Sequence, residues 1–189
     1  MTNALAATVA GPWGPIELAA TGRGVVALEV LVPREAFDRR LAARLGGTVE
    51  RSGGPGPASA LRDRAVAAVE AYFDGRPEAL TELPLDLDGR PGWDLAVLGG
   101  VQRVPYGQVT SYGRLAREIG RPGAARAVGG AVGRNPIGLA IPCHRVIAAD
   151  GSLGGYGGDW WGTREELLVI KLELLTREGV TLPARHSGG

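Results

Sequence analysis

The chain has 189 residues, of which 44% are hydrophobic and 22% charged, a balance typical of an ordinary globular protein. With one cysteine and two histidines it can form neither an internal disulfide nor a conventional structural zinc site. No apolar run approaches the roughly 20 residues that cross a bilayer, and the opening MTNALAATVAG lacks the basic residues of a signal peptide. We therefore expect a cytoplasmic protein without a membrane partner.

The first half of the chain predicts a small antiparallel sheet with helices. Apolar and polar residues alternate in three stretches separated by Gly- and Pro-rich turns, which is typical of a strand meander. The expected strands are 5–9, 16–20 and 25–32. Helical spacing of apolar residues then predicts helices at 33–45 and 58–73, and a further short strand is expected at 83–88. The turn Gly-Arg-Pro-Gly at 89–92 is the expected boundary, which predicts domains 1–88 and 89–189.

The second half predicts a mostly helical domain, so the expected fold class is α+β. Helices are expected at 93–104, 110–119 and 124–132. The last two are short and joined by a few residues that include glycines, which is the pattern of a helix-turn-helix, although many helical hairpins bind nothing.

Charge is distributed unevenly along the chain. Residues 1–100 carry 10 arginines against 13 acids, whereas 101–146 carry seven arginines against Glu118 alone. A basic surface in this region favours a polyanionic partner such as nucleic acid. The alternative is a solvated arginine-rich face without a ligand.

Cys143 is followed directly by His144 and Arg145. A lone cysteine is usually a small buried hydrophobe, but a neighbouring positive charge lowers the pKa of a thiol and makes it nucleophilic. Side chains of consecutive residues on extended backbone point apart, so His144 is expected to reach the sulfur through a water. A third group must orient the imidazole. Spacing alone does not choose among the available acids Glu165, Glu166, Glu173 and Glu178.

Residues 150–158 form a glycine-dense segment around Tyr156. It lacks the Gly-Lys-Ser/Thr ending of a phosphate-binding loop, so a nucleotide site is poorly supported. The glycines permit close backbone approach to a flat ligand, and a simple flexible turn is the alternative.

Several motifs together resemble one family. Pro-Cys-His-Arg-Val at 142–146 is preceded by Arg-Ala-Val-Gly at 126–129 and Asn-Pro at 135–136, and is followed by Gly-x-Leu-x-Gly-Tyr-x-Gly at 151–158. This set looks like the methylated-DNA–protein-cysteine methyltransferases, also called O6-alkylguanine-DNA alkyltransferases. The resemblance runs from about residue 93 to 179, while 1–88 fits only loosely.

The resemblance implies a function and a fold. The N-terminal domain would be ribonuclease H-like, and the C-terminal helix-turn-helix would dock in the minor groove of double-stranded DNA that contains alkylated guanine. The damaged base, O6-alkylguanine or also O4-alkylthymine, would be flipped into a pocket over the cysteine. The alkyl group would pass irreversibly to sulfur, once per molecule, without cofactor or metal, and the protein is expected to act as a monomer.

The resemblance also implies roles for particular residues. Cys143 would accept the alkyl group, His144 would deprotonate it through a water, and Asn135 would support the thiol. Tyr112 would rotate the target phosphate and protonate the departing guanine, and Arg126 would fill the space that the base leaves. Further DNA contacts are implied for Ala125, Ala127, Gly129 and Tyr112. The implied walls of the base pocket are Tyr156, Gly157, Val132 and Gly138.

The orienting acid follows from a motif, Lys-x-x-Leu-Leu-x-x-Glu-Gly, which starts here at Lys171 and selects Glu178. A competing alignment starts at Arg164 and would put Lys171 where the glutamate belongs. Gly138 stands where many relatives have proline, which predicts a wider pocket.

The segment 159–170 is longer than in the family. Its two tryptophans, Trp160 and Trp161, are interpreted either as a lid that stacks on DNA or gates the pocket, or as anchors of a longer loop on the core.

Two other functions are compatible with parts of the pattern. A non-catalytic sensor of alkylated bases would bind the same DNA, but such relatives lack the cysteine that stands at 143. A cysteine hydrolase would use Cys143 and His144, although such enzymes usually bring the histidine from a distant part of the chain.

Overall fold

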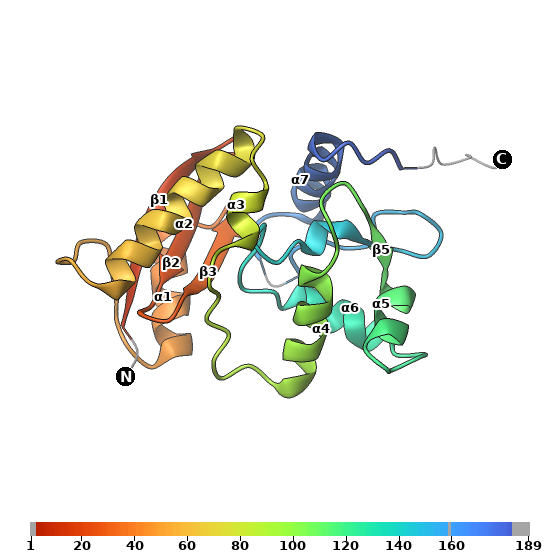
Figure 1. The fold of residues 1–189 in the computed structure, drawn as a ribbon, viewed down its shortest axis with the longest axis horizontal. Coiled ribbons are helices and arrows are strands. Elements are labelled where there is room, and N and C mark those ends of the chain that lie inside the picture. The colour runs from red at the N-terminus through yellow and green to blue at the C-terminus, as the bar shows by residue number, and fades with distance from the viewer. Residues whose placement is uncertain (1–2, 159, 183–189) are drawn as a thin grey trace. The chain divides into compact units, whose positions relative to one another are not determined.

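The computed structural model describes residues 3–158 and 160–182. The chain folds into two compact units, Met1–Gly89 with Pro136–Ala140, and Arg90–Asn135 with Ile141–Gly189. The fold is α+β, with a small mixed sheet in the first unit and, over the described residues, seven α-helices (Figure 1). Within those residues no helix is both long and apolar enough to cross a membrane.

The sheet of the first unit has four strands in the order β3-β2-β1-β4. β1 (Ala4–Gly11), β2 (Gly14–Ala20) and β3 (Val25–Val30) form the expected antiparallel meander. β4 (Val49–Glu50) pairs parallel to β1, so the expectation of a purely antiparallel sheet was wrong. A strand of two residues is too short to show an alternation of apolar and polar side chains. Its pairing depends instead on where the chain lies after α1.

Helices cover both faces of this sheet. α1 (Arg34–Leu45) ends at Gly46, whose φ of 58° is the left-handed conformation that glycine tolerates best. It packs on one face through Ala36, Phe37 and Leu41. α2 (Pro57–Phe73) contacts β1 and β2, and Figure 1 shows it on the side of the sheet facing the viewer, with α1 behind. The sheet is therefore a two-sided core rather than a half-exposed layer.

The segment expected as a strand at 83–88 is not one. Only Leu85 forms an isolated bridge, to Val25. Two backbone hydrogen bonds of 2.8 Å join the segment to Val25, which donates to the carbonyl of Pro84 and accepts from the N–H of Asp86. Side chains add to this, because Thr21 donates a hydrogen bond to Asp86 at 2.6 Å and Arg23 pairs with the same carboxylate at 3.1 Å. The short α3 (Glu78–Thr81), which the sequence did not predict, precedes it.

The second unit is mostly helical, and three of its helices match the expected ones. These are α4 (Gly92–Gln102), α5 (Tyr112–Glu118) and α6 (Ala125–Gly133). The helix expected from residue 110 begins at Tyr112, because β5 (Thr110–Ser111) pairs parallel with β6 (Val146–Ile147). Ser111 then caps the helix by accepting a hydrogen bond from the N–H of Arg114.

A further helix, α7 (Arg164–Arg177), was not predicted from periodicity, although its start is marked in the sequence. Thr163 and Glu166 form a reciprocal capping box there. The helix ends at Arg177, and Glu178 is its C-cap residue.

The segment before Cys143 belongs to both units in turn. Pro136 and Gly138 exchange backbone hydrogen bonds with Leu28 of β3 at 2.9 Å, so residues 136–140 extend the first unit. Ile137 and Ile141 are both fully buried, as expected for a segment that delivers Cys143 to the edge of a core.

Candidate active site

Cys143 begins a single 3₁₀ turn, Cys143–Arg145, immediately after Pro142. The turn breaks the extended backbone, so Cys143 and His144 are not the alternating pair that an extended chain would give. The cysteine is 2% exposed, yet its side chain lines a cavity of about 100 Å³. The thiol is thus buried without being sealed in apolar packing.

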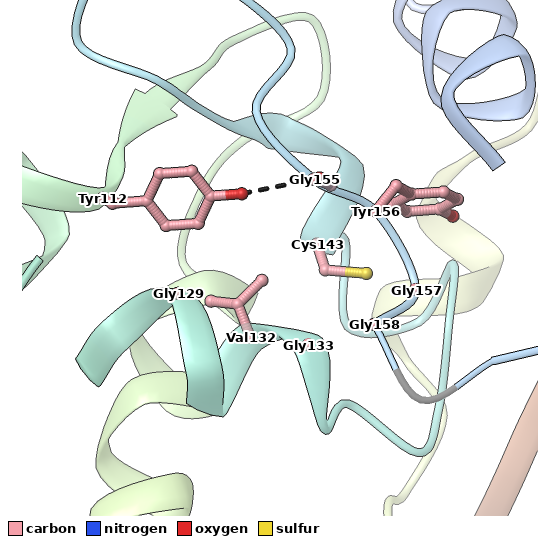
Figure 2. Close-up of a pocket in the computed structure, with 9 residues that line it drawn as sticks. All are labelled: Tyr112, Gly129, Val132, Gly133, Cys143, Gly155, Tyr156, Gly157 and Gly158. Atoms are coloured by element: carbon pink, nitrogen blue, oxygen red, sulfur yellow. Dashed lines mark hydrogen bonds between the residues drawn. The ribbon is translucent and has the colours of Figure 1, made fainter. Parts of the chain in front are cut away.

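The cavity is formed entirely by the second unit. Figure 2 shows the sulfur pointing toward the glycine-rich segment at 156–158. The side walls come from α5, α6 and the segment 155–158, and five of the nine lining residues are glycines. The lining residues are Tyr112, Gly129, Val132, Gly133, Cys143, Gly155, Tyr156, Gly157 and Gly158.

His144 is completely buried, and its Nε2 lies 2.7 Å from Oε1 of Glu178. A carboxylate only accepts hydrogen bonds, so Nε2 carries the proton in this pair. Burial lowers the pKa of His144, although the hydrogen bond with Glu178 opposes it. The ring is therefore neutral near pH 7, and Nδ1, which has no hydrogen-bond partner among the described residues, is left as a free base.

Glu178 is shared between His144 and Arg145. The guanidinium of Arg145 donates from Nε to Oε2 at 2.7 Å and from Nη2 to Oε1 at 2.9 Å. Burial works against ionisation of Glu178, but the hydrogen bonds of His144 and Arg145 outweigh it and lower its pKa to about 2. The carboxylate is therefore ionised at any neutral pH, and it neutralises the charge of Arg145.

This arrangement changes the electrostatics expected for the thiol. Burial raises the pKa of Cys143, and this effect outweighs the hydrogen bond with Asn135 and the positive charge of Lys171. The expectation that charges on His144 and Arg145 lower the pKa of Cys143 was wrong. The imidazole of His144 is neutral, and the charge of Arg145 is paired with Glu178. The resting sulfur is a thiol, so attack requires a base.

Two further residues with predicted catalytic roles lie at the site, Asn135 by its hydrogen bond with Cys143 and Tyr112 in the cavity lining. Asn135 is 2% exposed and donates from Nδ2 to the carbonyl of Ile141 at 2.8 Å, which ties it to the segment that carries Cys143. Tyr112 is the first residue of α5, and its hydroxyl is 3.5 Å from the carbonyl of Gly155. Burial raises the pKa of Tyr112, which keeps its hydroxyl protonated.

The residues predicted to contact DNA lie on α6, except for Tyr112, which begins α5. Arg126 and Ala127 are exposed, and Ala125 is half-buried, while Val128 on the other side of the helix is fully buried. A Cβ added to Gly129 would lie 3.7 Å from the ring of Tyr112, so the helix backbone passes close to that ring.

Among the predicted pocket residues, Tyr156, Gly157 and Val132 line the cavity, and Gly138 does not. Gly138 belongs to the first unit, where its N–H donates to Leu28.

Lys171 is a site residue to which the sequence assigned no role. It is the only lysine of the chain and is fully buried. Its Nζ donates to three backbone carbonyls, those of Val146 at 2.6 Å, Leu153 at 2.6 Å and Gly155 at 2.8 Å. Burial lowers its pKa to about 8. The ammonium of Lys171, with its three donors, joins β6 to the glycine-rich segment. The sequence signal that could have identified this residue was a single lysine in a chain that otherwise uses arginine.

Over residues 3–158 and 160–182, no group of three or more His, Cys, Asp and Glu side chains is arranged to hold a metal ion. The chemistry that the residues themselves support is nucleophilic: a thiol at a cavity, a neutral imidazole and a buried carboxylate that fixes the tautomer. The fold and site therefore define a protein that forms a covalent bond at a cysteine.

Comparisons with known proteins narrow this class. Residues 93–180 match the family model for 6-O-methylguanine DNA methyltransferase, DNA binding domain. A methylated-DNA–protein-cysteine methyltransferase of Mycobacterium bovis is 40% identical over 88% of this chain and 90% of its own length. One from Mycolicibacterium paratuberculosis is 52% identical over 50% of this chain and 56% of its own length.

A crystal structure of Mycobacterium tuberculosis OGT in complex with DNA is also similar. It has a TM-score of 0.70 and 35% identity, and the match covers 93% of this chain and 92% of that one. The chain belongs to the family of methylated-DNA–protein-cysteine methyltransferases.

Proposed function

We propose that this protein repairs DNA by transferring the alkyl group of O6-alkylguanine, after base flipping, to the sulfur of Cys143. O4-alkylthymine is included as a second substrate. Family membership supports the reaction, and one observation carries its assignment to this site. Cys143 lines a cavity and is followed by a histidine whose tautomer is held by a buried glutamate.

The proposed reaction begins with removal of the thiol proton. Nδ1 of His144 takes this proton through a water, and the hydrogen bond with Glu178 stabilises the imidazolium that forms. The sulfur then attacks the alkyl carbon, a C–S bond forms, and the C–O6 bond breaks with its electron pair remaining on the guanine. Asn135 supports the thiol by its hydrogen bond.

Tyr112 completes the proton balance. Its hydroxyl donates a proton to the departing guanine, and the proton held by His144 restores the tyrosine through solvent. The products are a thioether and an unmodified guanine. Because a thioether does not hydrolyse under these conditions and this chain has no second cysteine, each molecule reacts once.

We further propose that α5 and α6 form a helix-turn-helix that docks in the minor groove. Ala125, Ala127 and Gly129 would let the backbone of α6 approach the groove, as small residues permit. Arg126 would fill the space left by the flipped base, and Tyr112 would rotate the target phosphate. Tyr156, Gly157 and Val132 would hold the base.

The remaining parts of the proposal concern organisation. Residues 1–88 would be a ribonuclease H-like support domain, and 89–189 the DNA-binding alkyltransferase domain. A reaction that consumes one thiol per event requires one chain, so we propose a monomer, acting in the cytoplasm.

The function is tested by incubating the protein with duplex DNA that contains one O6-methylguanine and measuring its intact mass. We expect a gain of one methyl group, located on the peptide that contains Cys143, with a stoichiometry that does not exceed one. Binding without a gain in mass would instead indicate a sensor. Repeated turnover without a lasting gain would indicate a hydrolase.

Arg126→Ala is expected to slow transfer from duplex DNA but not from a free alkylated guanine base. Base extrusion costs a few kcal/mol, and loss of the residue that fills the gap should cost about tenfold or more in rate at saturating DNA. Single-turnover kinetics on both substrates measure this difference.

Arg117→Ala is the matched control for Arg126→Ala, because Arg117 is also exposed and lies on α5. Its loss should weaken DNA affinity through charge alone and leave the saturated rate unchanged. Equal losses in the two variants, or an equal loss on the free base, would contradict the role of Arg126.

A further inference from the structure

The two neighbouring tryptophans before α7 have opposite environments. Trp160 is 8% exposed, whereas Trp161 is 47% exposed. The pair is therefore not a single lid or a single anchor, and the two side chains must be considered separately.

Trp160 contacts two parts of the site at once. Its Nε1 donates a hydrogen bond of 2.9 Å to the carbonyl of Asn135. Its ring meets the ring of Tyr156 edge to face, with centroids 5.1 Å apart and an interplanar angle of 71°. The indole thus links the residue that supports the thiol with a wall of the cavity.

The same ring also determines the backbone beside the sulfur. Gly157 has a φ of 54°, and a Cβ placed there would lie 2.7 Å from Cε3 of Trp160. The N–H of Trp160 also donates to the carbonyl of Gly157 at 2.8 Å. Only glycine leaves room for the indole at this distance from the backbone. The indole of Trp160 therefore fixes the position of Gly157, which is part of the cavity wall.

Trp160 is not among the residues that line the cavity. We propose that Trp160 is a positioning residue that sets the width of the pocket above Cys143, and thereby the size of alkyl group that is transferred efficiently. This inference rests on the proposed function and deepens it. Trp160 acts through Tyr156 and Asn135, and without the indole Tyr156 relaxes into the vacated space and the pocket widens.

The test compares single-turnover rates on two duplexes, one with O6-methylguanine and one with O6-benzylguanine. In Trp160→Ala the ratio of the methyl rate to the benzyl rate is expected to fall roughly tenfold, because misplacement of a site wall by a fraction of an ångström has effects of this size. Trp160→Phe keeps an aromatic ring and loses the Nε1 donor, so its ratio should fall by a smaller factor.

The ratio separates positioning from a purely structural role. Loss of folded protein lowers both rates equally and leaves the ratio unchanged. Trp161→Ala, the matched control on the exposed neighbour, should keep the wild-type ratio. An unchanged ratio in Trp160→Phe and Trp160→Ala overturns the inference, and if the alanine variant does not fold, the phenylalanine variant decides alone. Failure of the wild-type protein to transfer either group would instead overturn the proposed function.

Discussion

Replacing Cys143 by alanine is expected to abolish alkyl transfer while leaving DNA affinity unchanged. The chain has no other cysteine, so no second thiol can accept the group. Cys143 is 2% exposed and lines the cavity, whereas Arg126 and Ala127 of α6 are exposed. Intact-mass spectrometry after incubation with O6-methylguanine DNA measures the first effect, and fluorescence anisotropy with the same duplex measures the second.

Cys143→Ser provides the control for this result. A hydroxyl preserves the shape of the side chain, but its far higher pKa makes it a much weaker nucleophile than sulfur at neutral pH. Any gain in mass by the alanine variant would mean that another residue accepts the alkyl group. Such a finding would remove the assignment of Cys143.

Glu178→Gln is expected to reduce both the transfer rate and the stability. Without the carboxylate, the imidazolium of His144 loses its counter-charge, and the contribution of a positioned base, about 10²- to 10⁴-fold, should be largely lost. Arg145 would be left buried without its partner, which costs on the order of 3 kcal/mol in the free energy of unfolding. Single-turnover kinetics and urea denaturation measure the two losses.

Glu165→Gln is the matched control, because Glu165 is exposed on the first turn of the same helix, α7. Its change should cost no more than about 1 kcal/mol, through the helix dipole alone, and should not alter the transfer rate. If Glu178→Gln reacted at the wild-type rate, the role of Glu178 in orienting His144 would be refuted.

The low pKa of Glu178 also predicts how stability depends on pH. The ordinary value is 4.5 and the folded value is about 2. A folded pKa below the unfolded one means that the unfolded chain binds the proton more readily, so the stabilisation is complete above pH 4.5 and is lost as pH falls toward 2. The difference in stability between the wild-type protein and Glu178→Gln should therefore shrink over this window.

Much of the first unit could be predicted because its elements are long and bounded by clear signals. Alternation identified β1 to β3, and helical spacing with a glycine stop identified α1. β4 and α3 have only two and four residues, too few for any period to be read. The segment at 83–88 has strand-like residues, but its backbone pairs only at the single bridge between Leu85 and Val25, so no ladder forms there.

The sequence by itself determined the chemistry that is possible: one thiol, an adjacent histidine, and the motifs that assign the family. Spacing left four acids open and only the motif of the resemblance selected Glu178, whereas the tertiary structure brings its Oε1 to 2.7 Å from Nε2 of His144 across 34 residues of chain. The tertiary structure also decided that burial raises the pKa of Cys143, and that Trp160 is buried while Trp161 is not. The spacing of residues shows only which of them are neighbours in sequence. The pKa of a group depends on its burial and on nearby charges, and packing brings those together from distant segments.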